Sequence, residues 1–517
     1  MRRLLVLGVA LACTAAAHGQ AEARGMVYND LNSNSILDNG EPGVPDVCVS
    51  NGRDLVVTDE SGKWSLPSDD DCTLFVIKPA GWGVQVNSDQ IPQYFYHHKP
   101  KGSPVKQVAG VPPTGPLPPS INFAVFKQDE PAMFDVLLFG DPQARGTKEV
   151  DFVTHDVVEE CAGTSAAFGI SLGDIVADDP GLFTTINQSI GQIGIPWYNT
   201  FGNHDYNRDA TANEYADDTY ELVYGPSTYA FEYGEVSFIN LNDVFFKPDG
   251  KSVCRFTDDQ LSFVKAYLER VSNDRLVVLL MHIPFLRCEN RDDFFSLFSG
   301  RPKVLAIAAH THTQFHRFVD KAGGWPGANP LHLFVNATVC GSWWCGAFDE
   351  RGIPHATMND GAPNGYSVLT FNGAEYSIRF KASRRPADYQ MNIYLPSEIQ
   401  AADVPNTDVL VNVFAGSSRS RVDMRIDRGE WIPLEQSPTE DPDCKRMSEL
   451  GPYLDQEVLG KKLDTVLGWK MDPPSVTDHM WKGKLAGTLA PGTHTVHVRT
   501  TDMFGQEFID RRIIRVK

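Results

Sequence analysis

The alternation of apolar and polar positions divides the chain into three regions. Between residues 25 and 127, short apolar runs at 47–50, 55–58 and 74–77 are separated by turn-forming residues, and a proline- and glycine-rich stretch follows at 110–120. Short strands bounded by turn residues are typical of all-β modules. We therefore expect a small N-terminal β module and a connector.

The other two regions differ in their periodicity. Residues 132–380 contain apolar strand-like runs such as 134–139, together with stretches of helical spacing such as 258–271. Residues 385–517 return to strand-like pieces around a looser segment at 438–474. The pattern predicts an α/β domain in the middle of the chain and a C-terminal β-sandwich.

The first 19 residues have the parts of an export signal. Arg2 and Arg3 are followed by an apolar run at 4–12 and by small residues up to Gly19, where a signal peptidase can cleave. The run is too short to span a bilayer, and no later segment is long enough. We expect a mature protein that is periplasmic or secreted and has no membrane span.

Net charge and cysteine content bear on the partners and the disulfide bonds of the protein. The chain has 46 lysine and arginine residues against 66 aspartate and glutamate residues, which gives a formal charge of −20 and argues against a nucleic-acid partner. Oligomeric state stays open. Cleavage of the signal removes one of nine cysteines and leaves an even number in an oxidising compartment. Proximity makes three pairs candidates, although sequence does not give connectivity: Cys48 with Cys72, Cys254 with Cys288, and Cys340 with Cys345.

Residues that can bind metals follow the predicted strands of the middle region. Each apolar run ends in a turn that holds a carboxylate, an amide or an imidazole. Because ligands at the carboxyl ends of parallel strands meet in one crevice, we expect these side chains to lie close together. Mixed nitrogen and oxygen donors suit two divalent ions such as Mn, Fe or Zn. The candidate ligands are Asp141, Asp174, Asn203, His282, His310 and His312.

The order of these blocks resembles that of the calcineurin-like metallophosphoesterase family: Asp, then Gly-Asp, then Gly-Asn-His-Asp, then His, then His-x-His. The resemblance implies a catalytic core in which a β-sandwich is flanked by helices. It also implies that a hydroxide bridging two metal ions attacks the phosphorus of a phosphoester. His204 would stabilise the transition state or protonate the leaving group. One ion would be held by Asp141, Asp174 and His312, and the other by Asp174, Asn203, His282 and His310.

Two positions depart from the family pattern. Gln143 stands where the first block usually has histidine, so we expect the first ion to be held more weakly or to differ in identity. Ala177 stands where a second acidic residue is often found and where purple acid phosphatases carry a tyrosine ligand, which predicts a colourless site. Asp178, the next residue, is a candidate to orient His204.

Further similarity lies in four stretches, at residues 199–201, 341–344, 353–358 and 360–366. With them, nearly the whole mature chain resembles a bacterial subgroup of exported family members with small β domains on both sides of the catalytic domain. The resemblance implies a small phosphoester substrate, either a monoester or a diester.

Three residues of these stretches are candidates for the rim of the crevice. Trp343 and Trp344 would stack on a sugar or base, and His355 would contact phosphate. The alternative is that they pack the sheet edge and order a loop.

The N-terminal module contains a second metal-like pattern. Oxygen-bearing side chains stand at positions one, three, five, nine and twelve of a calcium loop, while position six is Ser35 in place of the usual glycine. The loop is similar to those of dockerins and of calcium-binding B-type repeats. Calcium would stiffen the module, and a plain turn rich in Asp and Asn is the alternative. The loop residues are Asp30, Asn32, Asn34, Ile36, Asp38 and Glu41.

Two other functions stay open. Residues 169–173 match Gly-x-Ser-x-Gly, the nucleophile elbow of α/β-hydrolases, which would make Ser171 the nucleophile of a serine esterase. A second alternative is an inactive surface-binding protein with a degenerate phosphoesterase domain. The nearly complete ligand set favours a phosphoester hydrolase over both.

Overall fold

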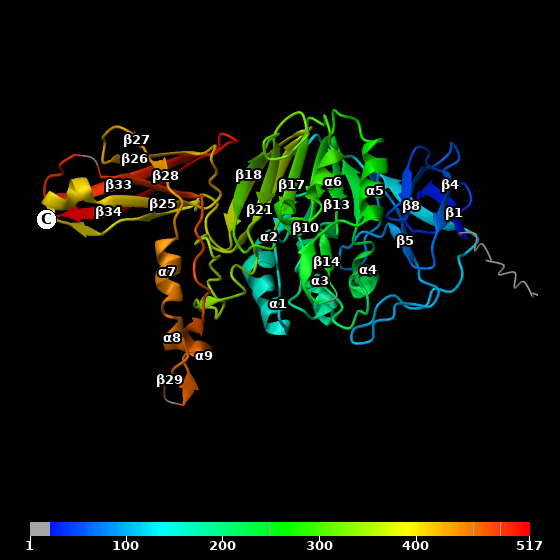
Figure 1. Cartoon of the computed structure of the whole chain (residues 1–517), viewed down its shortest axis with the longest axis horizontal. Coiled ribbons are helices and arrows are strands. Elements are labelled where there is room, and N and C mark those ends of the chain that lie inside the picture. Colours follow the sequence, from blue (N-terminus) through cyan, green and yellow to red (C-terminus); the bar gives the residue numbers. More distant parts are fainter. Residues whose placement is uncertain (1–20, 248, 459, 486) are drawn as a thin grey trace, which may run out of the picture.

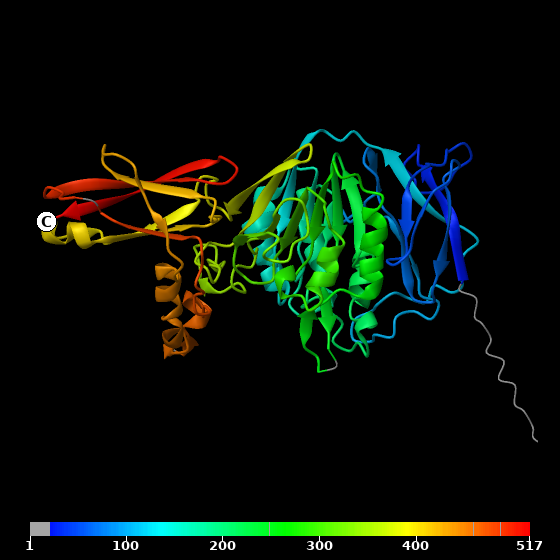
Figure 2. The ribbon, with the colours of Figure 1, turned by 45° about the horizontal axis from the view of Figure 1, so that its top comes forward.

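The computed structural model describes residues 21–247, 249–458, 460–485 and 487–517, so the expected export signal lies outside the described part. Three β-rich units follow one another along the long axis (Figures 1 and 2). Across the described ranges, no helix has both the length and the apolar character that crossing a membrane requires.

The N-terminal unit consists of two four-stranded sheets. Their strands are β1 (Ala21–Asn29), β2 (Cys48–Ser50), β3 (Leu55–Val57), β4 (Lys63–Ser68), β5 (Cys72–Val76), β6 (Trp82–Gly83), β7 (Phe95–His98) and β8 (Ile121–Lys127). The strand orders are β4-β1-β8-β6 and β3-β2-β5-β7. Burial alternates along β4, where Trp64 and Leu66 are buried between exposed neighbours. This period of two is what a strand with one face on a core requires.

The middle unit contains two larger sheets with helices outside them. Its strands are β9 (Met133–Phe139), β10 (Phe168–Ser171), β11 (Trp197–Asn199), β12 (Tyr229–Tyr233), β13 (Val236–Asn240), β14 (Val244–Phe246), β15 (Ser252–Cys254), β16 (Leu276–Leu280), β17 (Val304–Ala308), β18 (Phe315–Val319), β19 (Leu331–Val335), β20 (Gly346–Ala347), β21 (Gly365–Asn372) and β22 (Glu375–Ala382). Its helices are α1 (Thr147–Val153), α2 (Glu159–Cys161), α3 (Phe183–Ile190), α4 (Asp218–Tyr224), α5 (Asp258–Leu268) and α6 (Arg291–Ser296).

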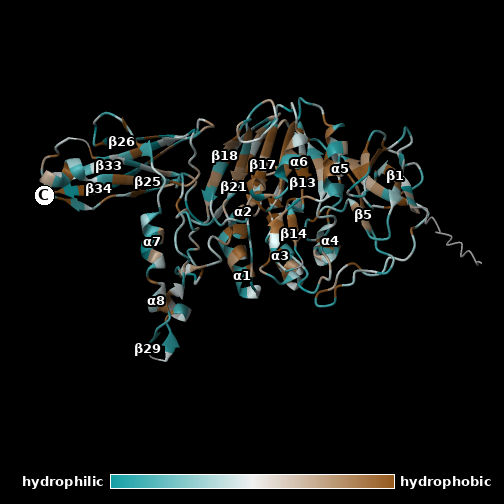
Figure 3. Cartoon of the chain, in the orientation of Figure 1, coloured by the Kyte–Doolittle hydropathy of each residue, from teal (hydrophilic) through white to brown (hydrophobic). Residues whose placement is uncertain are grey.

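These two sheets face each other across an aromatic core. The first has the order β11-β10-β9-β21-β22 and the second β12-β13-β16-β17-β19-β18. Phe168 of β10 contacts Phe238 of β13 with ring centroids 5.4 Å apart. In Figure 3 the strands of both sheets are largely hydrophobic. This is the sandwich flanked by helices that the family resemblance implied.

Parallel strands in both sheets end at the same edge of this sandwich. β9, β10 and β11 run parallel in the first sheet, and β13, β16, β17 and β19 run parallel in the second. The carboxyl ends of each set therefore meet at one edge. The start of α5 is set by nearby residues, since Thr257 and Gln260 form a capping box there. The sequence pattern predicted a start at Asp258.

The C-terminal unit is a second sandwich with a helical insert. Its strands are β23 (Met391–Tyr394), β24 (Glu398–Ile399), β25 (Asp408–Val413), β26 (Arg421–Ile426), β27 (Ile432–Pro433), β28 (Glu435–Gln436), β29 (Glu457–Val458), β30 (Lys461–Lys462), β31 (Gly468–Trp469), β32 (Met480–Lys484), β33 (Gly492–Thr501) and β34 (Glu507–Val516). The helices α7 (Pro442–Ser448), α8 (Gly451–Leu454) and α9 (Asp464–Leu467) belong to the insert, which projects from the sandwich beside the middle unit (Figure 1). The two main sheets are β23-β25-β32-β28 and β24-β34-β33-β26-β27.

Of the three expected disulfides, one forms and two do not. Cys254 and Cys288 form a disulfide, as expected, whereas the described cysteines of the other two pairs are free. Cys48 and Cys72 lie on paired strands in the wrong register: Val49 pairs with Val76, so Cys72 lies five residues, roughly 17 Å along the strand, from the position opposite Cys48. A disulfide requires Cα atoms within about 7 Å. Cys340 is buried against Gln143, and the Cys345 thiol donates to the carbonyl of Trp343.

Candidate metal centre

All six candidate ligands gather at the edge where the parallel strands end. Asp141, Asp174 and Asn203 follow β9, β10 and β11, and the histidines follow β16 and β17 on the facing sheet. Ligand atoms of Asp174, His282 and His310 all lie within 4.8 Å of one another. Two sheets therefore contribute to a single cluster.

His282 lies at the centre of this cluster. Its Nε2 is 3.1 Å from each of three atoms, namely Oδ2 of Asp174, Oδ1 of Asn203 and Nδ1 of His310. Asp141 Oδ2 lies 3.7 Å from His312 Nε2 on the other side. Four lone-pair donors that converge in this way suit a divalent cation with mixed nitrogen and oxygen ligands.

Backbone carbonyls orient two of the imidazoles. Nδ1 of His282 lies 2.9 Å from the carbonyl oxygen of Leu172, and Nδ1 of His312 lies 2.7 Å from that of Gly341. When Nδ1–H donates to a carbonyl, Nε2 keeps its lone pair for a metal. Both Nε2 atoms face the carboxylates, so the ring orientation fits metal binding.

The pKa shifts within the cluster indicate that it favours a bound positive charge. Burial raises the pKa of Asp141 to about 7, whereas Asp174, although buried, has its pKa lowered by the charge and hydrogen bond of His282. Burial alone would lower the pKa of His282, but attraction to Asp174 raises it to about 10. The carboxylates that raise the pKa of His282 would also attract a divalent cation, which would then take the place of the proton.

The backbone of the site is strained at many positions. Seven non-glycine residues of the site have left-handed φ values, each of which costs about 1–3 kcal/mol and persists only where the surroundings impose it. Gly202 cannot be replaced, because a Cβ there would lie 2.0 Å from the backbone nitrogen of Asp174. The strained residues are Asp141, Gln143, Asp174, Asp178, His310, His312 and Trp343.

His204 lies beside the cluster and is held by Asp178. Its Nδ1 is 2.8 Å from Asp178 Oδ1, and Arg208 holds the other carboxylate oxygen at 2.7 Å. The backbone N–H of His204 donates to Asp174 Oδ1 at 2.8 Å, which ties the turn to the cluster. This arrangement leaves Nε2 of His204 available to a substrate.

Gln143 contacts the cluster through its amide nitrogen. Nε2 donates to Asp174 Oδ2 at 3.1 Å, and Cys340 donates to the amide oxygen at 3.5 Å. The fully buried amide therefore lies beside the candidate ligands and hydrogen-bonds the carboxylate of Asp174.

Of the three rim candidates, the structure places one at the site. The indole of Trp343 is parallel to the imidazole of His312 at 5.3 Å and edge-on to that of His204 at 5.0 Å. Trp344 was placed wrongly: it is fully buried, and its Nε1 donates to the carbonyl of Pro142.

His355 was also placed wrongly at the rim. It is exposed and lines a separate polar cavity of about 240 Å³ together with Arg384 and Asn392, and no candidate ligand lines that cavity. Trp343 therefore contacts a candidate ligand whereas His355, twelve residues later, does not.

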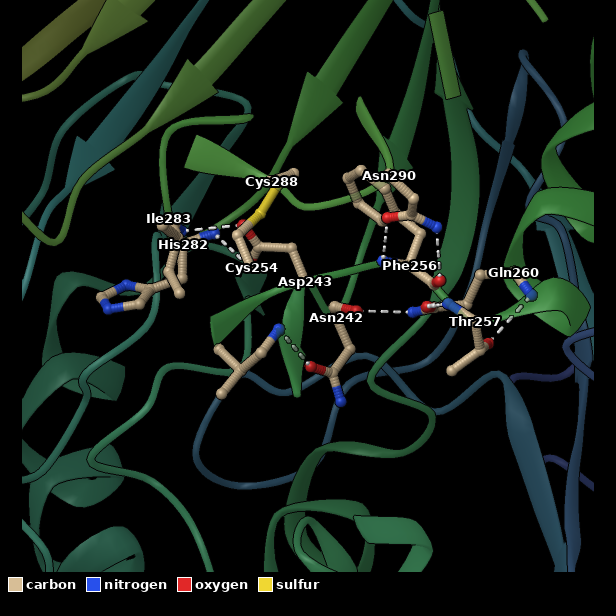
Figure 4. The surroundings of a disulfide bond; sticks show 11 residues. Asn242, Asp243, Cys254, Phe256, Thr257, Gln260, His282, Ile283, Cys288 and Asn290 are labelled. Atoms are coloured by element: carbon tan, nitrogen blue, oxygen red, sulfur yellow. Dashed lines mark hydrogen bonds between the residues drawn. A yellow bond between two sulfur atoms is a disulfide. The ribbon is translucent and has the colours of Figure 1, made fainter. Parts of the chain in front are cut away.

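Sequence reasoning gave no role to two buried carboxylates of the site. Asp205 accepts the N–H groups of Val176 and Gly202, and burial raises its pKa. Asp243 accepts those of His282 and Ile283 and lies beside the disulfide, with the His282 ring directed away from the sulfurs (Figure 4). Asp205 was visible in the Gly-Asn-His-Asp block, whereas Asp243 had no sequence signal.

The N-terminal loop adopts a closed geometry. Asp38 Oδ2 accepts the side-chain amides of Asn32 and Asn34 at 2.8 Å, and Glu41 accepts the backbone N–H groups of Leu31 and Asp38. Ser35, at position six, has a φ of 60°, the conformation for which calcium loops prefer glycine. These contacts are compatible with either a calcium loop or a plain turn.

Comparisons with known proteins show to which family the chain belongs. Family profiles described as Calcineurin-like phosphoesterase, N terminal of Calcineurin-like phosphoesterase and C terminal of Calcineurin-like phosphoesterase match residues 134–314, 32–108 and 334–508. Among curated proteins, none matches the chain. A solved purple acid phosphatase from yellow lupin (Lupinus luteus) seeds is 12% identical, with 65% of this chain and 67% of that chain covered and a TM-score of 0.37. The three profiles together span most of the sequence, and the chain belongs to the calcineurin-like phosphoesterase family of phosphoric ester hydrolases.

Proposed function

We propose that this chain hydrolyses small phosphoesters with two divalent metal ions, and that it acts outside the cytoplasm. The single observation that carries the proposal is the convergence of six nitrogen- and oxygen-bearing side chains on one edge of the sandwich, with His204 beside them. Asp141, Asp174 and His312 would hold one ion, and Asp174, Asn203, His282 and His310 the other. When bound, the ions would activate water and neutralise charge on the phosphate.

The residues of the chain supply the remaining steps. His204 donates a proton from Nε2 to the leaving oxygen, which matters most for alkyl esters because an alkoxide is a poor leaving group. Asp178 keeps the Nδ1 proton of His204 directed toward itself and so fixes the ring. Gln143 donates to Asp174 and restrains the carboxylate that would bridge the ions. Without a tyrosine at Ala177, the site should be colourless.

The serine esterase alternative lacks an accessible nucleophile. Ser171 is fully buried at the end of β10, and its hydroxyl accepts a hydrogen bond from Trp197 Nε1 at 2.8 Å. We expect Ser171→Ala to keep most of the activity. An inactive domain would not need to retain a complete set of converging ligands, which disfavours the surface-binding alternative.

The decisive experiment combines metal analysis with paired substrates. Purified protein would be analysed for Mn, Fe and Zn and then assayed against matched phosphomonoesters and phosphodiesters. Asp174→Ala and His204→Ala should abolish or strongly reduce hydrolysis, whereas Asp292→Ala, which removes an exposed carboxylate of the same domain, should not. Full activity in Asp174→Ala would overturn the mechanism.

A further inference from the structure

The C-terminal insert reaches the catalytic site through a short chain of contacts. β31 of the insert pairs with β20 of the middle domain, with Gly346 opposite Trp469 and Ala347 opposite Gly468. A Cβ at Gly468 would lie 2.2 Å from the carbonyl oxygen of Gly346, so only glycine allows this approach. The pairing fixes the insert against the segment that carries Trp343.

The Trp469 ring contacts two positively charged side chains of the middle domain. The guanidinium of Arg145 lies 5.5 Å from its ring centroid, and the ammonium of Lys148 lies 5.0 Å from it. Phe152 and Phe348 contact the same ring at 6.0 and 5.6 Å. The half-buried indole thus contacts four side chains of the catalytic domain.

Arg145 connects this contact to the site. Its Nη2 donates to the carbonyl oxygen of Trp343 at 2.8 Å, and Glu149 holds the guanidinium at Nε and accepts the backbone N–H as well. The side chain of Arg145 is 46% exposed, so its position depends on these partners. The Trp469 ring packs against the same guanidinium that reaches Trp343.

Trp343 has a conformation that needs such support. Its φ is 62° and that of Trp344 is 54°, two consecutive left-handed residues without glycine. Strain of this kind is retained only where the surroundings impose it. The strained backbone directs the indole of Trp343 against both His204 and His312.

We infer that Trp469, acting through Arg145, is a positioning residue that holds Trp343 against His204 and His312. The inference rests on the proposed function and assigns a role to the C-terminal insert, which completes the active site from outside the catalytic domain. Loss of the Trp469 ring frees Arg145, which relaxes Trp343 and lets the imidazole of His204 turn away from the leaving group.

The test uses the full-length protein and compares two tryptophans of the C-terminal domain. Trp469→Ala is the variant. Trp431→Ala is the matched control, because Trp431 also contacts two guanidinium groups, those of Arg425 and Arg499, but these belong to the C-terminal sandwich. We expect kcat of Trp469→Ala to fall about tenfold with little change in KM, as a displaced catalytic group causes. Trp469→Phe, which keeps an aromatic face, should restore most of the loss.

A spectroscopic readout is independent of activity. With 5-fluorotryptophan incorporated at the nine tryptophans, the ¹⁹F resonance of Trp343 is assigned by its absence in Trp343→Phe. It should shift in Trp469→Ala and in Arg145→Ala but not in Trp431→Ala. Wild-type kcat and an unshifted resonance in Trp469→Ala would overturn the inference, even if Asp174→Ala is inactive as the proposed function requires. Activity that survives in Asp174→Ala would overturn the proposed function itself. The ¹⁹F comparison would still test whether Trp469 positions Trp343 through Arg145.

Discussion

The disulfide behind the metal centre offers a prediction whose size follows from the structure. Cys254 and Cys288 lie 34 residues apart, and both are buried beside Asp243. Replacing both cysteines with alanine removes the crosslink and the contact of the Cys254 sulfur with Asp243 Oδ2 at 3.4 Å. Two losses are expected, one in the stability of the catalytic domain and one in its metal affinity.

The stability loss comes from the entropy of the unfolded chain. For a closed loop of 34 residues, the chain-entropy model gives about 4 kcal/mol at 25 °C. The metal effect has a separate cause. Asp243 holds the N–H groups of His282 and Ile283, so a displaced Asp243 loosens the turn that carries His282, the centre of the candidate cluster. Loss of such supporting contacts typically lowers metal affinity by about 10- to 100-fold.

The assay must report the catalytic domain alone, because a chain of three units need not unfold in one step. Hydrogen exchange of peptides from β13 and β16, followed by mass spectrometry across a urea series, provides that readout, and calorimetric titration with Zn or Mn measures affinity. The control is the Cys48→Ala, Cys72→Ala double variant, which removes two thiols and no crosslink. A difference from this control below about 1 kcal/mol would refute the loop-entropy reasoning.

Three further predictions concern other parts of the chain. Asp178→Asn should lower kcat by about 10- to 100-fold with metal content unchanged, because His204 loses the carboxylate that orients it; an unchanged kcat would contradict this role. Calcium should raise the unfolding temperature of the full-length protein, and Glu41→Gln should abolish that shift if the N-terminal loop binds calcium. Burial lowers the pKa of His316 to about 3, against about 6.5 in an unfolded chain, so the unfolded state takes up the proton first and stability falls as pH drops from about 6.5 toward 3. Urea unfolding at several pH values should show a shallower decline in His316→Gln, and equal slopes would count against this cause.

Much of the fold was readable from local pattern. The apolar run at residues 134–139 falls within β9, and α5 begins at the predicted residue. Strand pairing across units was not readable. The insert at residues 438–474 looked irregular because its short strands depend on partners far away in the sequence, as β31 depends on β20.

The sequence by itself indicated the candidate metal ligands, because they lie in turns that follow apolar runs, and such runs are a local property of the chain. It also indicated their order and the separation into three units. Tertiary structure alone decided which neighbours orient them. Trp343 and Trp344 are adjacent and chemically identical, yet one faces His204 and the other is buried, since their orientation depends on a backbone held by distant residues. Long-range packing likewise formed one of the three candidate disulfides and brought Trp469 against Arg145, because register and close approach depend on contacts that no local pattern records.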